Sequence, residues 1–160
     1  MKLKDSVMKK ISNHILDCIK ASEPEIQYIA LKELKSILLD YPLLLEQNEY
    51  TLFCRNIDPI YVKLEKLSIL VHIATDDNIH LILNEFKEVV NYKNGTLTKR
   101  AMEVLVDCCI QLSSSADKII LTISEFLENA EPKTFEIVIP CITVSIIVFS
   151  VKFKVVNRII

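Results

Sequence analysis

Apolar residues recur every three or four positions along most of this chain, which is the spacing that lines one side of an α-helix. The clearest helix start is Asp58-Pro59. We expect the Asp58 carboxylate to cap this helix, and Pro59 suits the first helical position because its missing N–H would be unpaired there anyway. The apolar line is then Ile60, Leu64, Leu67, Val71 and Ala74. The polar residues that fall largely on the other side are Lys63, Glu65, Lys66 and Ser68.

The same periodicity predicts further helices. They cover residues 6–19, 24–40, 79–90, 97–112 and 119–127, with a shorter segment near 43–54. The apolar line of the first of them is Met8, Ile11, Ile15 and Cys18. Strand signals are weak, since only the tail beyond Ile137 is rich in β-branched residues.

Several short motifs predict where these helices begin and end. Ser22 and Glu25 match a reciprocal capping box, with Pro24 in the first turn. Asn94-Gly95 should close the helix at 79–90, because this dipeptide takes positive φ most readily. Asp76-Asp77-Asn78 offers alternative caps at the start of that helix.

The spacing of the helix starts predicts a repeat. Comparable starts fall near Pro24, Pro59, Thr98 and Pro132, which are 35, 39 and 34 residues apart. Each interval has room for two helices, as in HEAT and armadillo arrays, where no pair buries its apolar side alone and each stacks on its neighbours. We therefore expect an all-α fold, an α-solenoid of paired antiparallel helices, over residues 1–135. A closed helical bundle is the alternative.

The C-terminal segment, residues 136–160, differs from the rest. Residues 137–151 form a run of 15 residues without a charge, followed by Lys152, Lys154 and Arg158. A membrane-spanning helix needs about 20 apolar residues, so this run is short for that role. We expect a divergent apolar C-terminal helix or a truncated final repeat. A tail anchor through residues 137–151 is the alternative.

The composition narrows the class of protein. Hydrophobic residues make up 51% and charged residues 25% of the 160, which excludes a disordered chain. The single glycine, Gly95, excludes the glycine-rich loops that bind nucleotides. The formal charge of -2 gives no basic excess for nucleic acid. The five cysteines lack CxxC spacing, which suggests reduced thiols in the cytosol.

No group of residues has the spacing of a catalytic or metal site. His72 and His80 are eight residues apart, and zinc binding is not expected at them. Ser113-Ser114-Ser115 reads as a turn between helices, with hydroxyls that a kinase could modify. The sequence therefore predicts neither an enzyme nor a cofactor.

Two decapeptides resemble a known family. Residues 22–31 read SEPEIQYIAL and residues 58–67 read DPIYVKLEKL, and both are similar to phrases in the trunk of beta-adaptin, the large beta subunit of clathrin adaptor complexes. Asp77-Asn78-Ile79, the segment 83–88 and Arg100-Ala101 continue the likeness in the same order. It covers roughly residues 7–130, so the chain resembles part of a trunk.

The resemblance implies a non-catalytic scaffold. Adaptin trunks assemble with a second large chain, a medium chain and a small chain. Their complexes reach membranes through phosphoinositides or an Arf-type GTPase and collect cargo into coated vesicles. The implied location is cytoplasmic, peripheral on Golgi, endosomal or plasma-membrane coats. The alternatives are another HEAT-repeat scaffold, of the coatomer or nuclear-transport type, and the tail-anchored membrane protein.

Lys63 and Lys66 are the candidate contact residues. They lie one helical turn apart, where they would meet an acidic partner or a lipid headgroup. A solvated surface without a ligand is the simpler interpretation, because isolated surface charges contribute little.

Overall fold

The computed structural model describes residues 2–20, 23–41, 45, 49–128, 136, 139–140 and 143. Most of these residues are helical, and none of them lies in a β-strand. The chain forms two compact units, Met1–Ile73 and Ala74–Ile160. The prediction of an all-α fold is confirmed.

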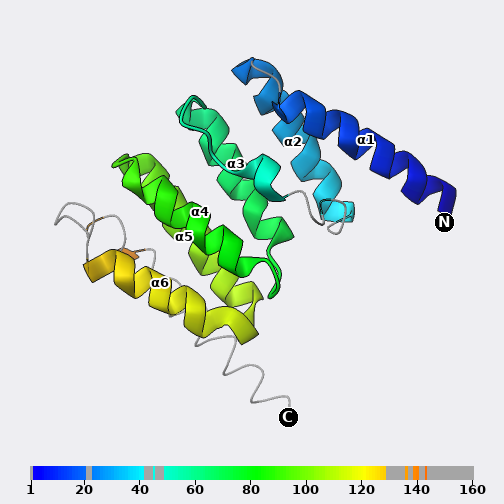
Figure 1. The fold of residues 1–160 in the computed structure, drawn as a ribbon. Helices are drawn as coiled ribbons and strands as arrows, with labels where there is room; N and C mark the ends of the chain where they lie inside the picture. The colour runs from blue at the N-terminus through cyan, green and yellow to red at the C-terminus, as the bar shows by residue number, and fades with distance from the viewer. Residues whose placement is uncertain are drawn as a thin grey trace, which may run out of the picture. The chain divides into compact units, whose positions relative to one another are not determined.

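The first unit contains α1 (Lys2–Lys20), α2 (Pro24–Asp40), the short 3₁₀ helix η2 (Glu49–Leu52) and α3 (Ile60–Ile73). The short connection between α1 and α2 makes them an antiparallel hairpin, and α3 packs beside α2 (Figure 1). η2 lies against α1 and α3. The buried apolar side chains of this unit include Leu16, Ile19, Leu31, Leu34, Leu38, Leu52, Leu67 and Leu70.

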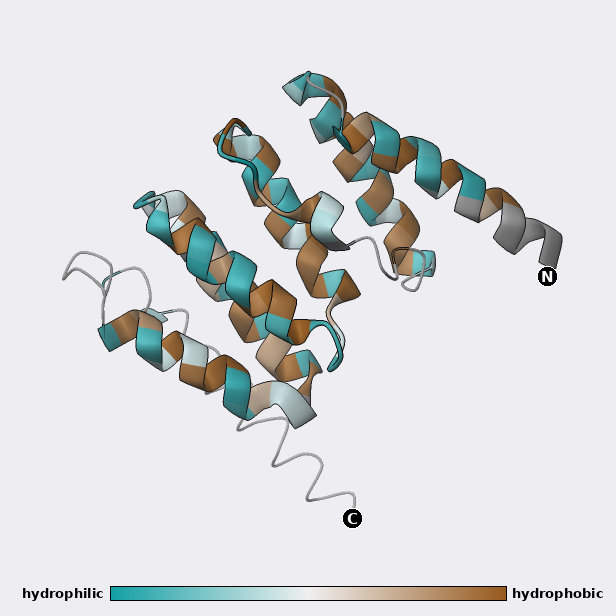
Figure 2. Ribbon diagram, viewed as in Figure 1, coloured by the Kyte–Doolittle hydropathy of each residue, from teal (hydrophilic) through white to brown (hydrophobic). Residues whose placement is uncertain are grey.

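The second unit contains α4 (Ile79–Asn91), α5 (Gly95–Gln111), η3 (Ser113–Ser115) and α6 (Ala116–Glu128). Bands of hydrophobic and hydrophilic residues alternate along α4 and α6 (Figure 2). The buried side chains include Ile79, Ile82, Phe86, Val89, Ala101, Met102, Val104, Leu105 and Ile119. In both units each helix packs on its neighbours in chain order, which is the arrangement expected of an α-solenoid.

Two predicted helix faces are wrong. In α1, Ile11 and Cys18 are exposed, whereas Leu16 and Ile19 are buried. In α3, ten of the fourteen residues are buried, and these include all four polar residues that were expected on a solvated side. Ile60 and Tyr61, by contrast, are exposed. Periodicity finds the most apolar side of a helix, but a helix covered by several neighbours buries its polar side as well.

The helix ends differ from the predicted ones in instructive ways. Glu23 is the cap residue of α2 and no side chain caps this helix, while Ser22 lies outside the described residues. α2 ends at Asp40, as predicted from Pro42. At α3 the predicted cap is wrong, because the backbone oxygen of Pro59 accepts the first helical hydrogen bonds and the Asp58 carboxylate binds elsewhere.

Side chains hold the starts of α4 and α5. Thr75 and Asn78 form a reciprocal pair, in which the Thr75 N–H donates to Asn78 Oδ1 at 2.8 Å and the Asn78 N–H donates to Thr75 Oγ1 at 3.3 Å. Asn94 Oδ1 accepts from the N–H groups of Thr96 and Leu97, both at 3.1 Å.

The predicted positive φ at Asn94-Gly95 is wrong. Asn94 has φ −107°, Gly95 opens α5, and Lys93 takes the left-handed conformation with φ 50°. The asparagine therefore starts a helix instead of ending one, because its carboxamide can accept from two N–H groups of the next helix.

The serine turn is joined to the start of the second unit. Ser114 and Ser115 donate their hydroxyls to the Asp76 carboxylate at 2.6 and 2.5 Å. These hydrogen bonds, that from Ser114 first, hold the pKa of Asp76 below its ordinary value of 3.8. Asp76 thus connects the segment before α4 to η3, and does not cap α4.

The described cysteines are free thiols. Cys108 is buried and Cys109 is half-buried. Burial, together with the nearby Asp107 carboxylate, raises the pKa of the Cys108 thiol to about 12. This thiol is therefore protonated and unreactive at neutral pH.

Most of the C-terminal segment 136–160 lies outside the described residues, so its nature stays a prediction. Among the helices that are described, none has the length and apolarity needed to cross a bilayer.

The cap of α5 yields a stability prediction. Replacing Asn94 by alanine leaves the N–H groups of Thr96 and Leu97 without their acceptor, so we expect Asn94→Ala to lower the free energy of unfolding by about 1 kcal/mol. Urea titration followed by circular dichroism measures it. Asn84→Ala, at an exposed position inside α4, is the matched control and should change stability by less than about 0.5 kcal/mol. Equal effects of the two substitutions would contradict the capping role.

Candidate functional site

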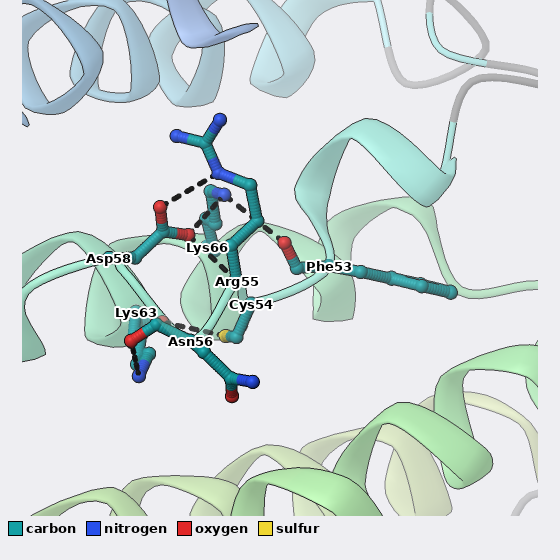
Figure 3. Close-up of polar contacts among 7 residues, drawn as sticks. All are labelled: Phe53, Cys54, Arg55, Asn56, Asp58, Lys63 and Lys66. Carbon is teal, nitrogen blue, oxygen red and sulfur yellow. Dashed lines mark hydrogen bonds and ion pairs between the residues drawn. The ribbon is translucent and has the colours of Figure 1, made fainter. Parts of the chain in front are cut away.

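A buried ion pair joins α3 to the segment that precedes it. The Lys66 Nζ lies 2.6 Å from Asp58 Oδ2, and both side chains are only 1% exposed. The same ammonium donates to the backbone oxygen of Phe53 at 3.1 Å (Figure 3). Lys66 therefore binds both ends of the segment 53–58.

Arg55 completes this cluster from within the segment. Its backbone N–H donates to Asp58 Oδ2 and its Nε donates to Asp58 Oδ1, both at 2.9 Å. The N–H of Asp58 donates to the backbone oxygen of Arg55 at 3.0 Å, which closes a tight turn. The carboxylate thus accepts three hydrogen bonds, two from cationic side chains and one from the backbone.

These contacts outweigh the effect of burial on Asp58. Burial alone raises the pKa of its carboxyl, but the hydrogen bonds from Lys66 and Arg55 favour the charged form and hold the pKa below 3.8. Asp58 is therefore a carboxylate at neutral pH, and the cluster is an ion pair and not a neutral hydrogen-bonded pair.

The helix geometry explains how Lys66 reaches back to Asp58. Side chains on an α-helix lean toward its N-terminus, so a long side chain in the second turn of α3 extends over the first turn. The Asp58 carboxylate lies there because Pro59 disfavours the helical conformation at Asp58, which therefore stays outside the helix. The spacing of eight residues thus brings the two charges together.

Lys63 binds the same segment one turn earlier. Its Nζ donates to the backbone oxygen of Asn56 at 3.4 Å, and the Cys54 thiol donates to the backbone oxygen of Lys63 at 3.9 Å. Both predicted contact lysines are therefore buried against their own chain, and the expectation of a solvated side is wrong. A contact with an acidic partner or a lipid headgroup stays a prediction.

A pocket of about 270 Å³ opens beside this cluster. Its walls come from the end of α1, from η2 and from the segment before α3, and the lining residues are Ile19, Lys20, Tyr50, Thr51, Phe53, Arg55 and Lys66. Sequence reasoning missed Lys20 and Arg55. No periodic signal could have found them, because they are distant in the chain and meet only when η2 packs against α1.

A second polar cluster joins α2 to α3. Glu65 accepts from Lys32 at 2.8 Å and lies 3.8 Å from the Lys35 ammonium, which donates to Ser68 at 3.1 Å. Tyr28 packs edge-on against Tyr61, with ring centroids 5.5 Å apart. This cluster explains why Glu65 and Ser68 are covered, since Lys32 and Lys35 of α2 bind them.

The second unit has a pocket of about 280 Å³ between α4, α5 and α6. Its lining is mostly apolar, with Phe86, Val90, Met102, Leu105 and Phe126. The ion pair between Lys87 and Glu125, 2.8 Å long, lies at this pocket. Such a pocket offers apolar surface for packing and few polar or charged groups.

Among the described residues that line the two pockets, Glu125 is the one carboxylate. Within those residues, no three His, Cys, Asp or Glu side chains gather as a metal site would require. The lysines and the arginine at the first pocket are suited to bind an anion. The geometry therefore defines the class as a helical-repeat protein.

Comparison with known proteins agrees with this class. The model of the "Adaptin N terminal region" family matches residues 1–155. The chain is 31% identical over 124 residues to the human "AP-1 complex subunit beta-1". The matched region covers 78% of this chain and 13% of that protein. It is 32% identical over 130 residues to the Saccharomyces cerevisiae "AP-1 complex subunit beta-1", covering 78% and 18%. The "AP-3 complex subunit beta" of Dictyostelium discoideum is 30% identical over 111 residues, covering 69% and 10%.

The chain belongs to the adaptin N-terminal region family. The resemblance to beta-adaptin is confirmed, since these relatives are beta subunits. The chain spans only about 13% of the length of the human relative.

The ion pair yields a second stability prediction. Lys66→Met leaves the Asp58 carboxylate buried with Arg55 alone, so we expect it to lower the free energy of unfolding by about 3 kcal/mol, as removal of one partner of a buried pair does. Urea titration measures the loss. Lys99→Met, at an exposed position of α5, is the control and should have little effect. The double variant Asp58→Asn/Lys66→Met should recover part of the loss, and no recovery would show that Lys66 acts by packing alone.

The same pair predicts a dependence on pH. The pKa of Asp58 is lower in the folded chain than its ordinary 3.8, so the carboxylate stabilises the fold above that value. This contribution is lost as the pH falls through the folded pKa. Unfolding free energies measured from pH 6 downward should therefore decline less steeply below about pH 4 for Asp58→Asn than for the unaltered chain. Parallel curves would contradict this account.

Proposed function

We propose that this chain is a non-catalytic scaffold subunit of a clathrin-adaptor-type coat complex in vesicle-mediated intracellular protein transport. The supporting observation is the family match over residues 1–155, together with relatives named as beta subunits of AP-1 and AP-3 complexes. The pockets of the described residues support the same proposal, because they are suited to bind and not to react.

Binding through stacked helices requires exposed surfaces, and both units have them. Ile29, Leu39 and Ile57 are exposed in the first unit, and Ile120 and Leu121 are exposed in the second. Large apolar side chains in water are what a partner chain or a further repeat would cover. The polar clusters at Asp58 and Glu65 hold the surface of the first unit in one conformation. This surface therefore loses less conformational entropy when a partner binds.

The partners we propose are a second large chain, a medium chain and a small chain. The names of the relatives support assembly into a complex of subunits. The proposed location is cytoplasmic and peripheral on Golgi, endosomal or plasma-membrane coats, with recruitment by phosphoinositides or an Arf-type GTPase. The family resemblance supports this location and this recruitment.

Affinity capture tests the proposed function. The tagged full chain, expressed in cells, should retain medium and small adaptor chains identified by mass spectrometry. A variant with Leu121→Asp, which places a charge on the exposed apolar surface of α6, tests whether that surface contributes and should retain less of them. Ser124→Asp, exposed on the same helix, is the matched control.

The alternatives have their own outcomes in this experiment. Capture of coatomer or nuclear-transport chains in place of adaptor chains would contradict the proposal. A chain that stays in the membrane pellet after carbonate extraction only when residues 137–151 are present would instead support the tail anchor.

A further inference from the structure

The pocket between α1, η2 and α3 has an excess of positive charge. Lys20, Arg55 and Lys66 line it, and among the described residues Asp58 is the one carboxylate bonded to these cations. Three cations facing one anion leave an uncompensated positive charge at a recessed place, where water screens it less than on an open surface.

Several donors of these cations are not used inside the described part of the chain. Arg55 engages Asp58 through Nε, and Figure 3 shows its two terminal nitrogens directed away from that carboxylate. Lys66 uses two of its three ammonium protons, for Phe53 and Asp58. The Lys20 ammonium makes no hydrogen bond or ion pair with any residue that the structure describes.

The apolar part of the wall completes a binding site. Tyr50 and Phe53 pack edge to face, with ring centroids 5.2 Å apart, and Ile19 lies at the same pocket. Aromatic walls cover the aliphatic part of an entering side chain and exclude water from its charged end. Charge-assisted hydrogen bonds then gain strength, because the surroundings are less polar than water.

We propose that this pocket binds a side-chain carboxylate from an acidic segment of a partner protein. The terminal nitrogens of Arg55 form a planar fork that matches the two oxygens of a carboxylate. Lys66 supplies a buried charge, and Lys20 supplies an exposed one. The partner residue is a glutamate or an aspartate, and its methylene groups contact Tyr50 and Phe53.

The geometry favours a protein segment over a membrane surface. Lys66 is 1% exposed and the Arg55 side chain is 39% exposed, so only an inserted side chain can reach both. Recognition of anionic lipid needs a cluster of exposed basic residues that lies flat against the headgroups. Only Lys20 among the three cations is exposed in that way.

Nuclear magnetic resonance of the arginine side chains tests the proposal on the full chain. The sequence has three arginines, and Arg100 is paired with Glu103 at 3.0 Å, so it is an internal reference. Titration with a capped hexaglutamate peptide at low ionic strength should shift the Nε–H signal of Arg55 and leave that of Arg100 unchanged. Hexaglutamine should shift neither signal, and added salt should weaken the effect of hexaglutamate.

Two variants and one control locate the binding. Lys20→Gln, read through the Arg55 signal, should weaken the affinity about fivefold to tenfold because a charge-assisted contact is lost. Arg55→Gln, read through the backbone N–H of Thr51, should weaken it at least as much. Lys99→Gln, on α5, removes the same charge away from the pocket and should leave the affinity unchanged. Circular dichroism checks that each variant is folded.

Other results would overturn the inference. These are equal shifts with hexaglutamine, equal losses in Lys99→Gln and Lys20→Gln, or an Arg55 signal that responds to phosphatidylserine vesicles but not to hexaglutamate. The inference adds a partner chemistry to the proposed scaffold function, but the titration tests it without any adaptor chain. If the titration fails and adaptor chains are still captured, only the carboxylate-binding role of the pocket is contradicted. If the titration succeeds and no adaptor chains are captured, only the adaptor role is contradicted.

Discussion

The ion pair between Asp58 and Lys66 is the constraint on which the first unit depends. It fixes the segment 53–58 against α3, and that segment in turn supplies one wall of the basic pocket. A buried pair of this kind is weak support for stability as such, because two charges must leave water. Breaking the pair is costly all the same, since removing either partner leaves the other as a buried charge without compensation.

The segment 53–58 shows what the ion pair makes possible. Backbone groups outside a helix or strand need hydrogen-bond partners from elsewhere. Lys63 and Lys66 provide three of the hydrogen bonds through which the segment is held, two of them to backbone oxygens. The two lysines thus hold the segment 53–58 against α3, while other residues of α3 pack on α2.

Local signals predicted the helices well where the cause lay within a few residues. The periodicity found all six α-helices that the structure describes, and Pro42 correctly marked the end of α2. Asn94 was correctly singled out, but its role was reversed, because a carboxamide can end one helix or begin the next. Asp58 was predicted to cap the nearest helix, but its carboxylate instead binds the side chains of Arg55 and Lys66.

By itself, the sequence determined the helical class, the repeat of paired helices and the family, because these follow from periodicity and from short stretches that resemble the family. Tertiary structure alone decided which polar residues are buried and which of them meet. Lys20 and Arg55 lie 35 positions apart, and no local pattern joins them. Only the packing of η2 against α1 and α3 brings their charges to one pocket, since the energy of a charged group depends on neighbours that the chain supplies from elsewhere.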